Sequence, residues 1–303
     1  MNKMMGLTKR NILVYFKDKS SILFSMLTPL IVLVLYILFL KGTYVSAIEN
    51  SAKGLEGFIN TADIEKIAAG LLLAGILGTA LITIPYNTLM TIVKDKENKV
   101  DFDISATPIN RVNIILSYFV ASAFSAFVMT AAVTTIGLAV MRIDLGFTVA
   151  ANDLAGIYMI ILLGSVSASA LFMIAMMFFK TSNASAAFMG LLSAAAGFLI
   201  GAYVPLSEFS DSMESVCNLF PATQITVLLK RFLLSDTLFG INEKIGGVDG
   251  GTFVDGIKEG FSMNAFFYGR TFEMGCSVAY IFAIIILSVI VISMIYPRIY
   301  KRK

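Results

Sequence analysis

Charged residues are absent from six long apolar stretches of this 303-residue chain, and all 23 Lys and Arg and all 20 Asp and Glu lie between or beyond them. A helix rises about 1.5 Å per residue, so about 20 apolar residues cross a hydrocarbon core of about 30 Å. A charge at mid-bilayer costs about 2.5–3.5 kcal/mol. The pattern therefore predicts an all-α membrane protein with six transmembrane helices, at Ser20–Leu40, Ile67–Val93, Val112–Met141, Leu154–Phe179, Thr181–Ser207 and Met274–Pro297.

The composition favours the same class. The chain is 57% hydrophobic, with a mean hydropathy of +0.84, which is well above the range of soluble domains. The alternative, a soluble protein with six buried helices, does not fit stretches of this length. We expect the first stretch to be a span and not a cleaved signal peptide, because it is long and is followed by Lys41.

The basic residues of the connecting segments alternate between the two sides of the predicted spans. One side carries fourteen basic and five acidic residues, and the other carries nine basic and fifteen acidic residues. By the positive-inside rule we expect both termini in the cytoplasm. The mild net charge of +3 is typical of a protein at a membrane surface, and it does not indicate nucleic-acid binding.

Several kinds of chemistry are excluded by composition. The chain has no histidine, so His-dependent acid–base catalysis and His-ligated zinc are excluded. It has no phosphate-binding G-x-x-x-x-G-K-[ST] loop, so it does not hydrolyse ATP in the P-loop manner. Cys217 and Cys276 are both on the predicted outer side, either as a disulfide or as two separate thiols. No ionisable residue lies at mid-depth in a span, which argues against a proton- or ion-coupled carrier, although Pro29 and Pro85 could break spans.

Two segments on the predicted cytoplasmic side contain further helices. In Met5–Ser20, apolar side chains share one helical face, which predicts an interfacial amphipathic helix or a simple basic flank. In the loop 94–111, a short segment Val100–Ala106 ends at Thr107-Pro108, where proline disfavours helix in the preceding residue. This pattern predicts a small helix at the tip of a hairpin, which is either a docking site for a soluble partner or an ordinary solvated loop.

The same loop resembles a signature of the permease subunits of ABC-2 type transporters, the type-2 ABC exporter family. The similarity lies in the run from Glu97 through Lys99 to Ala106-Thr107-Pro108-Ile109-Asn110-Arg111. The resemblance implies that this segment is a coupling helix that contacts a separate P-loop ATPase. The candidate coupling residues are Glu97, Lys99, Thr107, Pro108 and Arg111. The chain differs from the family pattern at Asn98 and Lys99, and at Asp101 and Asp103 within its leucine-rich stretch.

A second similarity to the family follows the fifth span, in Gly201 … Pro205, Asn218 … Pro221 and Lys230-Arg231. It implies two short re-entrant extracellular helices before the last span, with Pro205, Pro221 and Arg231 as their motif residues. The segments Met213–Phe220 and Ala222–Leu234 are apolar but too short to cross a bilayer. We expect the Gly-rich stretch 236–269 to be a loose loop or to hold a partner-specific element.

We expect a single ABC-2 type transmembrane domain over 1–303. Its segments are an interfacial helix at 1–19, spans one to five within 20–207, the coupling loop 94–111, an outer loop 208–273, span six at 274–297 and a cytoplasmic tail at 298–303. Small residues line one face of span five at Gly190, Ala194, Gly197 and Gly201; they predict a homodimer or heterodimer interface, as in the resembling family, or packing within one subunit. Polar side chains that either line a pathway or bond to their own helix are Thr79, Thr83, Asn87, Ser165 and Ser169.

Together these features predict the membrane permease of an ATP-driven exporter for amphipathic or hydrophobic cargo such as a drug, a peptide antibiotic or a lipid-like molecule. No cofactor is expected on this chain, since ATP and Mg²⁺ belong to the partner subunit. The expected location is the plasma membrane, in a bacterium. Two alternatives remain at this point: a secondary carrier or channel, and a non-transporting immunity or sensor protein.

Overall fold

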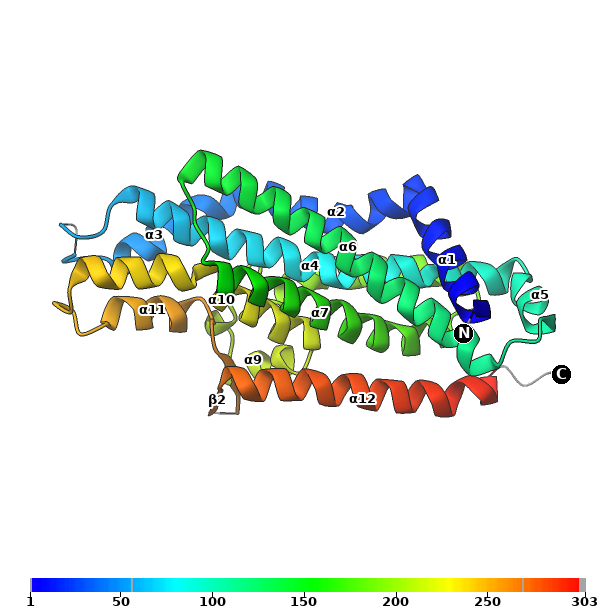
Figure 1. Cartoon of the computed structure of the whole chain (residues 1–303). Helices are drawn as coiled ribbons and strands as arrows, with labels where there is room; N and C mark the ends of the chain where they lie inside the picture. Colours follow the sequence, from blue (N-terminus) through cyan, green and yellow to red (C-terminus); the bar gives the residue numbers. More distant parts are fainter. Residues whose placement is uncertain (1, 56, 269, 300–303) are drawn as a thin grey trace.

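The computed structural model describes residues 2–55, 57–268 and 270–299, so the last residues of the predicted basic tail lie outside the described residues. Helices make up most of the chain, and the long ones run roughly along one direction in an elongated bundle, while α1 is inclined to it (Figure 1). They are α1 (Asn2–Lys17), α2 (Lys19–Leu35), the π-helical η1 (Tyr36–Leu40), α3 (Lys41–Ser51), α4 (Thr61–Glu97), α5 (Val100–Ala106), α6 (Arg111–Leu145), α7 (Ala151–Phe178), α8 (Ser182–Leu199), the 3₁₀ turn η2 (Leu206–Glu208), α9 (Asp211–Asn218), α10 (Pro221–Ile245), α11 (Thr252–Gly260) and α12 (Met274–Ile299).

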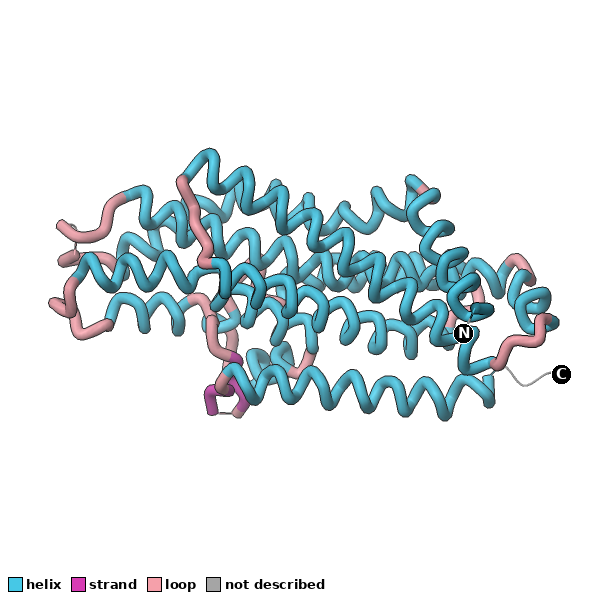
Figure 2. The backbone as a smooth tube through the Cα atoms, viewed as in Figure 1, coloured by secondary structure: helices cyan, strands magenta, loops and turns pink. Residues whose placement is uncertain are grey.

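Six helical segments in the described residues are long and apolar enough to cross a membrane, which confirms an all-α membrane protein with six predicted spans. They are Lys19–Ser51, Thr61–Glu97, Arg111–Leu145, Ala151–Phe178, Ser182–Leu199 and Met274–Ile295. The strands found in the described part, β1 (Ala265–Phe267) and β2 (Arg270–Phe272), form a small antiparallel hairpin just before α12 (Figure 2). The hairpin pairs Ala265 with Phe272.

Helix α4 is the centre of the bundle. It packs against α2, α6, α7, α8 and α10, and most of its apolar stretch is buried. Small residues allow this close approach: Thr226 of α10 and Ile200 leave no room for a Cβ atom at Gly78, and Leu234 leaves none at Gly70. Helix α12, in contrast, packs mainly on α7 at the edge of the bundle, and most of its surface is exposed.

The two ends of the bundle have different structures. Helices α1 and α5 lie at one end, with the N-terminus, and α3 and α11 lie at the other (Figure 1). We call these the α5 end and the α11 end. At the α11 end, helices extend beyond the charge-free stretches, and two ion pairs join their charges across neighbouring helices. Lys41 lies 3.2 Å from Glu65, and the Lys244 ammonium donates to Asp63 at 2.8 Å.

Three sequence-based predictions for the second half of the chain were wrong. Span five was expected to reach Ser207, but α8 ends at Leu199 because Gly201 turns the chain with φ of +68°. The second re-entrant helix was expected to be short, but α10 has 25 residues. The stretch 236–269 is not a loose loop, since it contains the end of α10, the helix α11 with buried Phe253 and Ile257, and the first strand of the hairpin.

Candidate functional site

The hairpin at the α5 end contains all five sequence-predicted coupling residues. Glu97 ends α4, Lys99 precedes α5, Thr107 follows α5 as its C-cap and Arg111 begins α6. The Thr107 hydroxyl donates to the Ile104 carbonyl at 2.6 Å. The Asn110 side chain accepts from the Val112 amide at 3.1 Å and so caps α6. The expected helix–break–helix pattern around Pro108 is therefore present.

Lys99 has a left-handed backbone, with φ of +62°. This conformation is uncommon for a residue with a side chain and is the one that glycine adopts freely. Lys99 makes the sharp turn between α4 and α5 in this conformation.

Helix α5 presents an exposed aromatic side chain at the tip of the hairpin. Phe102 is 67% exposed, between the acidic Asp101 and Asp103, and none of the described residues of α5 is buried. The sequence reasoning passed over Phe102 because it used the charges and the proline break of this loop. An apolar residue between two acids in a short surface helix was the signal that would have found it.

A buried carboxylate at the base of the hairpin holds α1 in place. Asp95 is 5% exposed and accepts from the Arg10 guanidinium with both oxygens, one of them at 2.7 Å, and also from the Tyr118 hydroxyl. A bidentate arginine–carboxylate pair of this kind is among the stronger polar contacts in proteins. Sequence reasoning missed it, because no local spacing links residues that are 85 positions apart.

A second ion pair joins the start of α2 to α4. The Lys94 ammonium donates to the Asp18 carboxylate at 2.7 Å, and this hydrogen bond lowers the pKa of Asp18 to about 2. Asp18 also caps α2 by accepting from the Ser21 amide at 3.2 Å. The carboxylate therefore keeps its charge to a more acidic pH than a free aspartate does, and it holds the joint between α1 and α2 against α4.

Glu97 links the same hairpin to α8. Its carboxylate accepts from the Ser182 backbone amide at 3.0 Å, at the N-terminus of that helix. A negative charge is favourable at this position, where the helix dipole and unpaired amides meet. Helices α2, α4 and α8 are therefore each connected to the base of α5.

The same three helices border a groove of about 620 Å³. Its walls are mostly apolar, with Phe24, Leu27 and Ile31 from α2 and Met90 from α4. Asn87, Lys94 and several hydroxyl side chains add polar groups to this apolar lining. A groove of this size and composition suits an amphipathic molecule.

The small-residue stripe of span five is divided between two environments. Gly190 and Ala194 are exposed and line the groove. Gly197 is buried and lies against the Tyr203 ring, which leaves no room for a Cβ atom, and Gly201 lies in the turn after α8 against Leu206. One half of the stripe thus packs inside the chain, and only the other half is open to a second copy.

The predicted pathway residues do not come together. Thr79 donates to the Gly75 and Ile76 carbonyls of its own helix, and Ser165 donates to Ile161 of its own helix. Thr83 donates to the Ser25 carbonyl at 2.6 Å, and Ser169 bonds with Ser122 at 2.9 Å. Asn87 donates to Thr83 but also faces the groove. Hydrogen bonding to helix backbone, the second reading of the sequence pattern, accounts for Thr79 and Ser165.

The motif residues of the second sequence similarity lie in separate elements that follow α8 in the chain. Pro205 precedes η2, and Pro221 begins α10, where a missing N–H costs nothing. Arg231 borders a separate cavity at the α11 end. Its neighbour Lys230 is 3% exposed and donates to the Phe261 carbonyl at 2.9 Å, which fastens α10 to the end of α11.

In the described residues, no group of three or more Cys, Asp or Glu is placed to hold a metal ion. Cys217 is buried and Cys276 is exposed, and both are free thiols. Of the two alternatives for these cysteines, the structure has two separate thiols and not a disulfide.

Comparison with known proteins assigns the family. No curated protein and no solved structure matches the chain. A family model described as ABC-2 family transporter protein matches residues 43–296, which run from α3 to α12 and include α5. The chain therefore belongs to the ABC-2 transporter family, as one of its membrane permeases.

Proposed function

We propose that this permease is the non-enzymatic membrane subunit of an ATP-driven exporter. A separate P-loop ATPase binds α5 and drives the conformational change of the permease. The exposed Phe102 at the hairpin tip supports a docking role. The connections from the base of α5 to α2, α4 and α8 carry the proposal, because these helices border a groove that suits an amphipathic cargo.

In this proposal, ATP-driven closure of the ATPase subunits pushes α5 toward the membrane. Asp95 passes the motion to α1 through Arg10, and Lys94 passes it to α2 through Asp18. Glu97 passes it to α8 through the Ser182 amide. The three walls of the groove then move together, which changes the side on which the groove is open.

The proposed orientation places the α5 end in the cytoplasm of a bacterial cell and the α11 end outside the plasma membrane. The excess of basic residues in the segments at the α5 end supports it. The chain 1–303 is then one transmembrane domain with both termini inside. At the outer side, α9 and the first turns of α10 are proposed to re-enter the membrane, because Thr226 packs against Gly78 within span two.

The complete transporter is proposed to contain two permeases, either two copies of this chain or this chain and a similar one. The exposed Gly190 and Ala194 on α8 and the exposed Phe24 and Leu27 on α2 support a second permease across the groove. A drug, a peptide antibiotic or a lipid-like molecule has the amphipathic character that these walls accommodate, so multidrug efflux is one form of the proposal.

The double variant Pro108→Ala/Arg111→Glu tests the coupling. It alters the break after α5 and reverses a charge at the start of α6, so we expect ATP-dependent export to fall at least about tenfold, the effect of ~1.4 kcal/mol. Membrane insertion and yield should stay unchanged. Export is measured as efflux of an amphipathic dye from cells that contain the ATPase subunit, and undiminished efflux in the double variant would count against docking at α5.

A further inference from the structure

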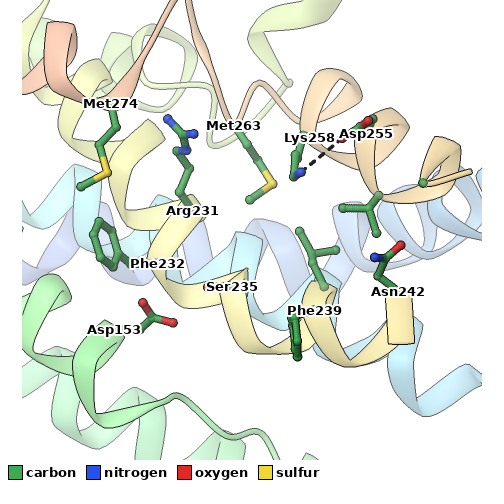
Figure 3. Close-up of a pocket in the computed structure, with 13 residues that line it drawn as sticks. Asp153, Arg231, Phe232, Ser235, Phe239, Asn242, Asp255, Lys258, Met263 and Met274 are labelled. Carbon is green, nitrogen blue, oxygen red and sulfur yellow. Dashed lines mark hydrogen bonds and ion pairs between the residues drawn. The ribbon is translucent and has the colours of Figure 1, made fainter. Parts of the chain in front are cut away.

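A second cavity, of about 570 Å³, lies at the α11 end of the bundle. Helices α10 and α11 form its walls, and the first residues of α7 and α12 complete it. Figure 3 shows that charged and apolar side chains both face this space. The cavity is remote from the groove between α2, α4 and α8, and the proposed export mechanism does not use it.

Two of the charged side chains that line this cavity form an ion pair with each other, and the other two do not. Lys258 and Asp255 of α11 pair with each other at 3.2 Å. Arg231 and Asp153 also line the cavity, and within the described ranges neither side chain has an ion-pair or hydrogen-bond partner. One cationic and one anionic group are thus available to a ligand.

The two available charges lie on helices that pack against each other, Asp153 on α7 and Arg231 on α10. Arg231 is followed by Phe232, whose ring packs so closely on Gly156 that a Cβ atom has no room there. Gly156 lies three residues after Asp153, on the same face of α7. In Figure 3, Arg231 and Asp153 lie on either side of the Phe232 ring.

The cavity reaches the level at which two of the spans begin. Asp153 is in the first turn of α7, and Met274 is the first residue of α12. Both helices are spans, so their first turns mark the level at which the chain enters the apolar layer. Met263, Met274 and Phe232 give the cavity an apolar wall beside its charges.

We propose that this cavity binds the headgroup of a zwitterionic phospholipid that carries a primary ammonium group. Arg231 contacts the phosphate, as an arginine fork suits, and Asp153 accepts from the ammonium. The acyl chains leave past Met274 along the exposed face of α12. One free cation and one free anion match a zwitterion, and an anionic lipid would leave Asp153 facing a like charge. The binding depends on neither the direction of transport nor the ATPase.

Lipid titration of the purified permease in detergent, followed by native mass spectrometry, tests this site. Phosphatidylethanolamine should bind about tenfold more tightly than phosphatidylglycerol with the same acyl chains, a difference of ~1.4 kcal/mol. Asp153→Asn should bring the two affinities within about twofold of each other, because it removes the acceptor for the ammonium. Arg231→Gln should weaken both lipids about tenfold.

Matched controls are available at the same end of the protein. Arg270 and Asp144 are exposed and do not line the cavity, so Arg270→Gln and Asp144→Asn should bind both lipids like the wild type. The ratio between two lipids is read within one protein sample, so partial loss of folded protein does not alter it. Equal affinities in the wild type, or equal losses in Arg270→Gln and Arg231→Gln, would overturn the site. Soluble glycerophosphoethanolamine that competes as well as the intact lipid would overturn the lipid assignment.

Discussion

Replacement of Phe102 by alanine is expected to weaken the docking of the ATPase subunit at least about 30-fold, which corresponds to the ~2 kcal/mol of an interface hot spot. The side chain is 67% exposed in the isolated permease, so its removal costs the fold little. The ATPase subunit is expected to bury Phe102 on binding, and the alanine variant loses the binding free energy of that burial. The measurement is the dissociation constant between the detergent-purified permease and the ATPase subunit, together with the melting temperature of the permease.

A matched control is Phe58→Ala. Phe58 is 42% exposed and lies in the loop between α3 and α4, at the opposite end of the bundle. Its substitution should leave the affinity for the ATPase unchanged. If Phe102→Ala binds the ATPase as tightly as the wild type and Phe58→Ala do, then α5 does not anchor the partner.

The largest effect on the permease itself is expected for Asp95→Asn. The amide cannot neutralise the Arg10 guanidinium, and breaking a buried pair from one side costs about 3–5 kcal/mol. We expect about 2–3 kcal/mol here, because the Arg10 side chain is 34% exposed and its charge remains partly hydrated. Helix α1 should therefore detach more often, which hydrogen–deuterium exchange of its backbone amides measures as faster exchange.

Two variants separate the ion pair from a general loss of charge. Asp103→Asn removes an exposed acid of α5 and should not alter exchange in α1. The double variant Arg10→Gln/Asp95→Asn should exchange more slowly than Asp95→Asn alone, since it leaves no uncompensated cation. Wild-type exchange rates in Asp95→Asn would show that α1 is held by apolar packing on α6 and not by this pair.

The spans could be predicted from the sequence because exclusion of charge from a bilayer leaves a mark in every segment that crosses it. The helices of the α11 end leave no such mark. The end of α10 and the helix α11 lie among glycines and acids, and their stability depends on contacts distant in sequence, such as Lys244 with Asp63. A local signal existed at Asp249, whose carboxylate accepts from the Gly251 and Phe253 amides at the start of α11.

The coupling hairpin could be placed from the sequence because proline and capping residues act locally. The groove could not, since it depends on which faces of three helices turn toward each other. The stripe at Gly190 and Ala194 was found, but its continuation was lost where Gly201 turns the chain. The contact of Lys94 with Asp18 at the start of α2 and that of Glu97 with Ser182 of α8 link the hairpin to the groove, and they follow from the fold alone.

Transport by purified permease in sealed vesicles, with and without its ATPase subunit, tests the central claim most directly. The account predicts that an amphipathic dye accumulates against its gradient only when the ATPase subunit and ATP are both present on the side of α5. It also predicts that an imposed proton or sodium gradient does not replace them. Uphill accumulation by the permease alone, in the absence of the ATPase subunit, would contradict the account.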